Sequence, residues 1–220
     1  MYTDRDSDAL NPDEVLNAVG DPEAFIEELR AAHRDRQYRR NLFVDSLSPD
    51  VKAEWIEGEA VYHSPAREAH NAATEATIQV LGVYSDLVSE LLIRVEKAMV
   101  EIGQHNFEPD ICVYRAADHS FSNDQVIYPR PDLVVEVLSK RTRERDFGIK
   151  KSQYEQAGVE EYWIVDADKQ EVTQFTAKND GYGLGEILNT DSTLKCIALS
   201  SLQFPVSIIW DRQRRLAWKK

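Results

Sequence analysis

The alternation of apolar and polar residues predicts a helical N-terminal part followed by a larger α/β part. Residues 21–45 carry an N-cap aspartate, a first-turn proline and apolar residues at helical spacing, which is typical of a helix. Residues 54–65 have the pattern of two short strands about a glycine, and a helix is expected over 64–87. We therefore expect an N-terminal helical extension over residues 1–45 and one domain over residues 46–220.

The larger part alternates between strand and helix patterns. Strands are expected over 91–103, 107–115 and 132–139, a helix over 143–158, and two further strands within 161–175. Together with the preceding helix, the order is helix, three strands, helix, strand, which indicates an α/β domain around one mixed sheet. The C-terminal stretch contains only short apolar runs, and we expect short strands and irregular segments there.

A carboxylate interrupts the most apolar of these strands. The run 132–139 is DLVVEVLS, typical of a strand buried on both faces, yet Glu136 lies in its middle. An unpaired carboxylate in that position costs several kcal/mol or shifts its pKa until it is neutral. Because side chains two residues apart share a face, Asp110 and Glu136 converge if their strands are neighbours. Two carboxylates at one point require a cation or a proton between them, and an oxygen pair with room for water suits Mg²⁺ or Mn²⁺.

The next predicted helix adds a lysine to this arrangement. At about 100° per residue, one stripe of the helix contains Phe147, Lys150, Tyr154 and Ala157, and it should pack on the sheet. Lys150 lies within the stripe, whereas Lys151 lies nearer its edge. An ammonium group beside a metal–carboxylate site can position or activate a water, or neutralise negative charge on a phosphate.

Structural roles for the same residues stay open at this point. Glu136 and Lys150 can form a plain buried salt bridge, and Asp110 can cap the start of a strand after a proline. His70 is expected to pack or to form a hydrogen bond rather than to bind a metal. Glu54 and the two other glutamates of its hairpin are expected to be solvated.

Composition and charge limit the partners that the protein can have. The chain has 220 residues and a formal net charge of −13, which argues against broad electrostatic attachment to nucleic acid. A phosphate-bearing substrate must then be met by metal ions and by a local basic patch. The segment after Glu136 is the best candidate for that patch, with the basic residues Lys140, Arg141, Arg143 and Arg145.

No apolar run is long enough to span a bilayer and no signal-peptide core is present, so we expect a cytoplasmic protein without membrane contact. Two distant cysteines make a disulfide framework or a structural zinc site an unfavoured interpretation.

Several motifs, in the right order over roughly residues 50–175, resemble the putative restriction endonuclease family, formerly a domain of unknown function, of the PD-(D/E)XK nuclease superfamily. They are WIEGEAVYHSPAREAHN, EPDICVY and PDLVVEVLSKRTRERDFGIKKSQYEQAGVEEYWIVD. The resemblance implies a restriction-endonuclease-like core with Asp110 as the motif aspartate and Glu136 as the motif acid. The usual lysine two positions after that acid is Leu138 here, and the resemblance implies that Lys150, four residues after Asp146, replaces it.

The resemblance and the residues together predict an endodeoxyribonuclease that hydrolyses phosphodiester bonds of DNA. Asp110 and Glu136 are the predicted metal ligands, Lys150 is the third catalytic residue, and the cofactor is Mg²⁺, with Mn²⁺ able to substitute. The alternative is a catalytically silent nuclease-fold module that binds DNA or a protein partner, which the acidic balance favours. DNA is the expected partner, and whether the chain forms a homodimer stays open.

Overall fold

A single helix, α2 (Pro22–Asp45), forms most of the described part of the N-terminal unit. The structure is a computed structural model that describes residues 20–48, 50–87, 90–200 and 202–218. The chain divides into two units with the boundary between Leu47 and Ser48. The side chain of Asp21 accepts the first free N–H groups of α2, from Glu23 and Ala24, at 3.1 Å, so the predicted N-cap is confirmed. Residues 1–19 of the predicted extension lie outside the described residues.

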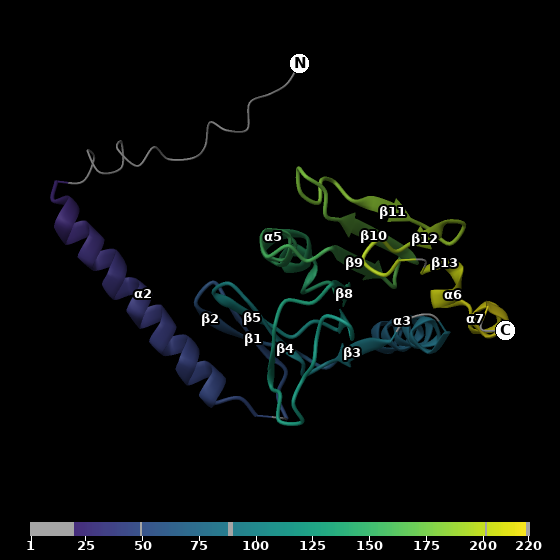
Figure 1. The fold of residues 1–220 in the computed structure, drawn as a ribbon, viewed down its shortest axis with the longest axis horizontal. Coiled ribbons are helices and arrows are strands. Elements are labelled where there is room, and N and C mark those ends of the chain that lie inside the picture. Colours follow the sequence, from purple (N-terminus) through teal and green to yellow (C-terminus); the bar gives the residue numbers. More distant parts are fainter. Residues whose placement is uncertain (1–19, 49, 88–89, 201, 219–220) are drawn as a thin grey trace, which may run out of the picture. The chain divides into compact units, whose positions relative to one another are not determined.

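A six-stranded mixed sheet is the centre of the second unit (Figure 1). In spatial order its strands are β11 (Glu186–Leu188), β10 (Glu171–Thr176), β9 (Glu161–Asp166), β8 (Leu133–Val137), β6 (Ile111–Arg115) and β3 (Leu91–Val95). Strands β8 and β9 are parallel, whereas the other neighbours are antiparallel. The helix α3 (Glu68–Leu87) precedes β3, and a helical segment joins β8 to β9. The predicted core order of helix, three strands, helix and strand is therefore confirmed, although α3 begins four residues later than expected.

A second sheet was not predicted, because the expected strand 91–103 is broken in the middle and the expected strand 107–115 is broken near its start. After β3 the backbone turns at Glu96 and Lys97, which have φ values of 35° and 55°. Between 107 and 111, Pro109 lacks an N–H for the ladder, so the chain enters β6 only at Ile111. The detached pieces join a five-stranded sheet, in the order β2 (Glu59–Tyr62), β1 (Ala53–Ile56), β5 (His105–Phe107), β4 (Met99–Ile102) and β7 (Ile127–Tyr128).

The helical segment after β8 contains a π-helical turn. It consists of α4 (Arg143–Arg145), the π-helix η1 (Asp146–Lys150) and α5 (Lys151–Gln156). The predicted end is confirmed, because Gly158 has φ 74° and Val159 donates its N–H to the carbonyl of Tyr154 at 3.0 Å, as in a Schellman motif. π-Turns inside helices are rare and often occur at functional sites.

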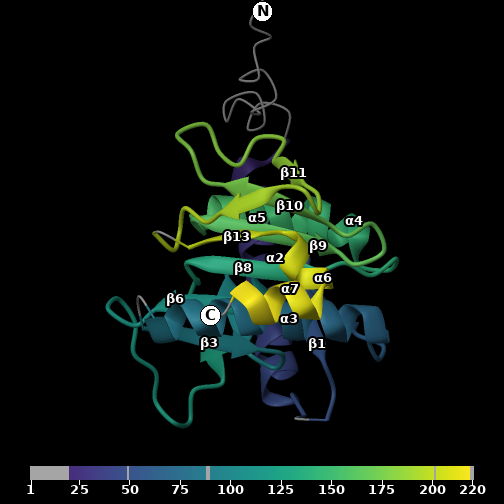
Figure 2. The ribbon, with the colours of Figure 1, turned by 90° about the vertical axis from the view of Figure 1, so that its right-hand side faces the viewer.

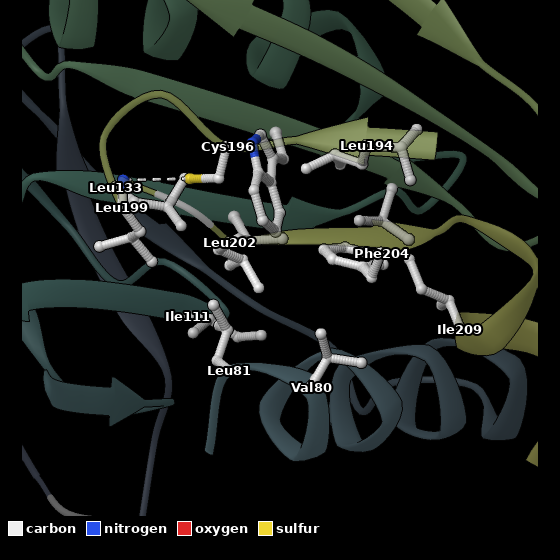
Figure 3. Packing of buried hydrophobic residues seen from close by; sticks show 14 of the residues in the cluster. Val80, Leu81, Ile111, Leu133, Leu194, Cys196, Leu199, Leu202, Phe204 and Ile209 are labelled. Carbon is white, nitrogen blue, oxygen red and sulfur yellow. Dashed lines mark hydrogen bonds between the residues drawn. The ribbon is translucent and has the colours of Figure 1, made fainter. Parts of the chain in front are cut away.

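Two hydrophobic clusters cover the two faces of the six-stranded sheet. The first cluster lies between the sheet and α3 with the C-terminal elements (Figures 2 and 3). Those elements are β12 (Thr193–Lys195), β13 (Gln203–Pro205), α6 (Ser207–Trp210) and α7 (Arg212–Trp218). Because two of them are helices, the expectation of only short strands and irregular segments in the C-terminal stretch was wrong. The second cluster lies between the opposite face, α5 and the five-stranded sheet. Glu136 belongs to this second face, because its strand neighbours at positions 134 and 138 do.

Neither cysteine forms a disulfide, and both thiols are buried. Cys196 lies in the first cluster, where its sulfur accepts the N–H of Leu199 at 3.3 Å (Figure 3). Across the described ranges, no helix has both the length and the apolar character needed to cross a bilayer.

Candidate functional site

Pairing between β6 and β8 brings the two predicted carboxylates together. Ile111 lies opposite Val135, so the next position along this antiparallel ladder places Asp110 opposite Glu136 on the same face. One oxygen of Asp110, Oδ2, accepts the backbone N–H of Val137 at 2.8 Å. Both carboxylates are buried, with 3% and 4% of their residue surfaces exposed.

The π-turn directs Lys150 into the same place. Its Nζ lies 2.9 Å from Oε1 of Glu136 and 2.8 Å from Oε1 of Glu54, and the side chain is 3% exposed. The structure therefore brings Asp110, Glu136 and Lys150 into one cluster, and their catalytic roles stay a prediction. The close contact with Glu136 also keeps the plain salt bridge as an interpretation to be tested.

Glu54 is a member of the cluster, and the expectation that it is solvated was wrong. All four residues of β1 are buried, because β1 lies between β2 and β5 in the second sheet. Beside its contact with Lys150, Glu54 accepts the backbone N–H of Glu108 at 2.9 Å and lies 2.8 Å from Nε2 of His63. A usable signal was present in the sequence: like Glu136, this glutamate interrupts an otherwise apolar strand.

Asp146 is a second acid that sequence reasoning did not assign to the site. It is 1% exposed, and its Oδ1 has no hydrogen-bond partner among the described residues. That oxygen lies 3.8 Å from Nζ of Lys150. The four-residue spacing between the two, on one face of a helix, was the available signal. Tyr154 completes this side of the cluster by donating its hydroxyl to Oε1 of Glu136 at 3.3 Å.

Two partly exposed side chains lie on the other side of Asp110. Nζ of Lys52 lies 2.8 Å from Oδ1 of Asp110, and Nε2 of His70 lies 3.5 Å from the same oxygen. The expected hydrogen-bonding role of His70 fits this contact. Lys52 was not considered from the sequence, because it precedes β1 and lies 58 positions from Asp110.

The acids of the cluster have opposite pKa shifts. Burial raises the pKa of Glu136 to about 8; Lys150 opposes this shift, and the charges of Asp110, Asp146 and Glu54 add to it. Burial alone would also raise the pKa of Asp110, but His70 and Lys52 lower it below its usual range. The pKa of Glu54 is likewise lowered to about 2, against the effect of burial, by Lys150 and His63. Burial also raises the pKa of Asp146, so Glu136 and Asp146 are the acids of the cluster whose ionised forms are stabilised least.

The donor atoms of the cluster fit a hard divalent cation. Four carboxyl groups (Glu54, Asp110, Glu136 and Asp146) lie around two ammonium groups (Lys52 and Lys150). If all four were ionised they would carry an excess of two negative charges, which agrees with the raised pKa values of Glu136 and Asp146. The hydrogen bonds that Glu136 accepts from described side chains go to Oε1, which leaves Oε2 for another ligand. Oxygen donors and a local negative charge are what Mg²⁺ and Mn²⁺ prefer. Asp110 and Glu136 are the residues that would hold such an ion.

The basic segment after β8 lies mostly in solvent. Arg141 donates to Oγ of Ser64 at 2.8 Å, and Arg143 donates to Asp166 at 3.2 Å while its guanidinium lies over the ring of Phe147. Both arginines are exposed, so these local contacts are worth little energy.

The fold is that of the restriction-endonuclease-like class of α/β proteins. The chain belongs to the putative restriction endonuclease family (Uma2), which matches residues 37–207. Among solved structures, it is similar to a putative nuclease belonging to DUF820 from Anabaena variabilis, at 17% sequence identity and a TM-score of 0.66. That match covers 81% of this chain and 97% of the other, and at this identity it shows the shared fold. No curated protein matches the chain.

Proposed function

We propose that the protein is a divalent-metal-dependent endonuclease that hydrolyses phosphodiester bonds of DNA. The observation that carries this proposal is the meeting of Asp110, Glu136 and Lys150 in a buried cluster in which carboxyl groups outnumber ammonium groups. Membership of a family described as putative restriction endonucleases supports it.

In this proposal each residue of the cluster has a separate role. Asp110 and Glu136 hold the metal ion, which when bound supplies Lewis-acid polarisation of the phosphate and activation of the attacking water. Lys150 positions the water or stabilises the charge that develops on the phosphate. Glu54 and Asp146 hold Lys150 in place, and Tyr154 orients Glu136 through its hydroxyl.

A plasmid-nicking assay tests the proposal. The wild-type protein is expected to nick DNA in Mg²⁺ or Mn²⁺ and not in chelator. Asp110→Asn should lower the rate by more than about 100-fold, the upper range seen for second-sphere groups around a metal. Glu186→Gln, a change of an exposed glutamate on β11, should keep the wild-type rate and serves as the control.

A folded wild-type protein that nicks under neither ion would support the silent module instead. The observation that favours this second candidate is the full pairing of Lys150 with Glu54 and Glu136, which leaves its ammonium group enclosed. Binding of DNA without cleavage would then be the function to examine.

The basic segment is expected to contribute to DNA affinity through phosphate contacts. Binding measured in Ca²⁺ should weaken steeply with salt, and replacing Lys140, Arg141, Arg143 and Arg145 by alanine should reduce the slope of log affinity against log salt by about 3. The control replaces Arg212 and Arg214, exposed residues of α7, by alanine and should leave the slope unchanged. An unchanged slope in the fourfold variant would place the DNA on another surface.

A further inference from the structure

The ammonium group of Lys52 lies against two of three potential metal ligands, Asp110, Glu96 and His70. Its Nζ lies 2.8 Å from Oδ1 of Asp110 and 3.7 Å from Oε1 of Glu96. Nε2 of His70 lies 3.5 Å from the same Asp110 oxygen. The three ligands come from separate elements: the first turn of α3, the turn after β3 and the residue before β6.

This position has the dimensions of a second metal site. One ligand atom each from His70, Glu96 and Asp110 all lie within 4.8 Å of one another. A cation of the chain itself is already there, however. A lysine ammonium is charged at neutral pH, and this one lies 2.8 Å from a carboxylate oxygen.

Phosphodiester cleavage benefits from two positive centres. In two-metal sites, cations about 3.5–4 Å apart stabilise the attacking and the leaving oxygens. A lysine ammonium can supply one of these charges as a compact cation with three donors. The side chain of Lys52 is 18% exposed, so donors not used by Asp110 can reach a bound phosphate.

We propose that Lys52 is the built-in second cation of the site, so that the protein binds a single divalent ion, at Asp110 and Glu136. This proposal rests on the proposed nuclease function. The position between His70, Glu96 and Asp110 takes no metal ion, because the ammonium group excludes one by charge and by contact.

Removing the charge of Lys52 should open this position to a metal ion. Lys52→Met keeps the length of the side chain and removes its charge, and Lys52→Gln is a second neutral variant. An imidazole nitrogen and two carboxylate oxygens then form a ligand set that first-row divalent metals accept. Lys52→Arg keeps a cation in place and should continue to exclude the ion.

The test counts Mn²⁺ ions per chain, by calorimetry and by electron paramagnetic resonance, on the full chain without DNA. The wild type and Lys52→Arg are expected to bind one ion, and Lys52→Met and Lys52→Gln two. Adding His70→Ala to Lys52→Met should return the count to one. Lys97→Met removes a neighbouring exposed lysine and should leave one ion bound. Circular dichroism and melting curves establish which variants are folded.

Two results would overturn the proposal. The first is a wild type that binds two Mn²⁺ ions, which means that Mn²⁺ displaces the ammonium group of Lys52. The second is a folded Lys52→Met or Lys52→Gln variant that binds only one Mn²⁺ ion. A wild type that binds no ion would instead refute the metal dependence of the proposed function, and this inference with it.

Discussion

Without divalent ions, Glu136→Gln is expected to stabilise the protein at pH 8 by on the order of 3 kcal/mol, roughly 8 °C in melting temperature. The pKa of Glu136 is raised to about 8 in the folded protein from a model value of 4.5. A group with a raised folded pKa contributes its full stability below the unfolded pKa and loses it as the pH rises through the folded value. The wild type should therefore lose stability between about pH 4.5 and pH 8, whereas the glutamine of the variant cannot titrate. At pH 4.5 the two proteins should melt together.

Adding Mn²⁺ should reverse this order at pH 8. The wild type gains stability with the logarithm of the metal concentration, because the ion binds the folded state. The glutamine variant lacks one ligand charge and should gain much less. Melting curves at pH 4.5, 6 and 8, in chelator and in Mn²⁺, measure both effects, with Glu186→Gln as the exposed control. If Glu136 serves only as the partner of Lys150, the variant should instead melt well below the wild type in chelator, since a broken buried pair costs about 3–5 kcal/mol.

Lys150→Met should destabilise the metal-free protein by about 3–5 kcal/mol at pH 8. Lys150 is the shared cation of Glu54, Glu136 and Asp146, and it is enclosed with them. Methionine keeps much of the side-chain volume but leaves three carboxylates close together. The folded pKa of Glu54 then loses the effect of Lys150 that lowers it, and the already raised pKa values of Glu136 and Asp146 rise further. The variant should therefore lose more stability at pH 8 than at pH 5.

Urea denaturation at these two pH values measures the loss. The matched control is Lys151→Met, next in sequence, whose side chain is 23% exposed and whose contact with Glu155 is at 4.0 Å; it should cost less than about 1 kcal/mol. The double variant with Glu136→Gln should recover part of the loss, because one of the three carboxylates is then neutral. Equal stability of Lys150→Met and the wild type would mean that the cluster does not depend on this lysine.

The acidic total of the chain and a DNA substrate are compatible if the cations lie at the site itself. The two lysines of the cluster and one bound divalent ion would supply four positive charges beside four carboxylates. The site would then no longer repel a phosphate, while the rest of the surface stays acidic. This is why DNA binding is expected to depend on divalent ions.

The sequence by itself determined which segments are helices and strands in the core and which acids are the candidate metal ligands. Strand alternation is a property of the backbone, so the sequence could predict that Asp110 and Glu136 converge if their strands are neighbours. The pairing of β6 with β8 supplied that condition. Capping residues likewise marked the start of α2 at Pro22 and the end of the helical segment at Gly158. The resemblance over several ordered motifs placed Lys150 at the same site.

Only the tertiary structure decided which other charged side chains lie beside Asp110, Glu136 and Lys150. Glu54 and Lys52 lie far in sequence from Asp110 and Glu136, and their place depends on a second sheet that forms because β3 and β6 do not continue into β4 and β5. Burial of a strand residue depends on what covers the strand, which local pattern does not contain, so a buried glutamate in β1 looked like a solvated one. The π-turn that contains Asp146 and Lys150 was also not predicted, because the sequence pattern there is that of an ordinary α-helix.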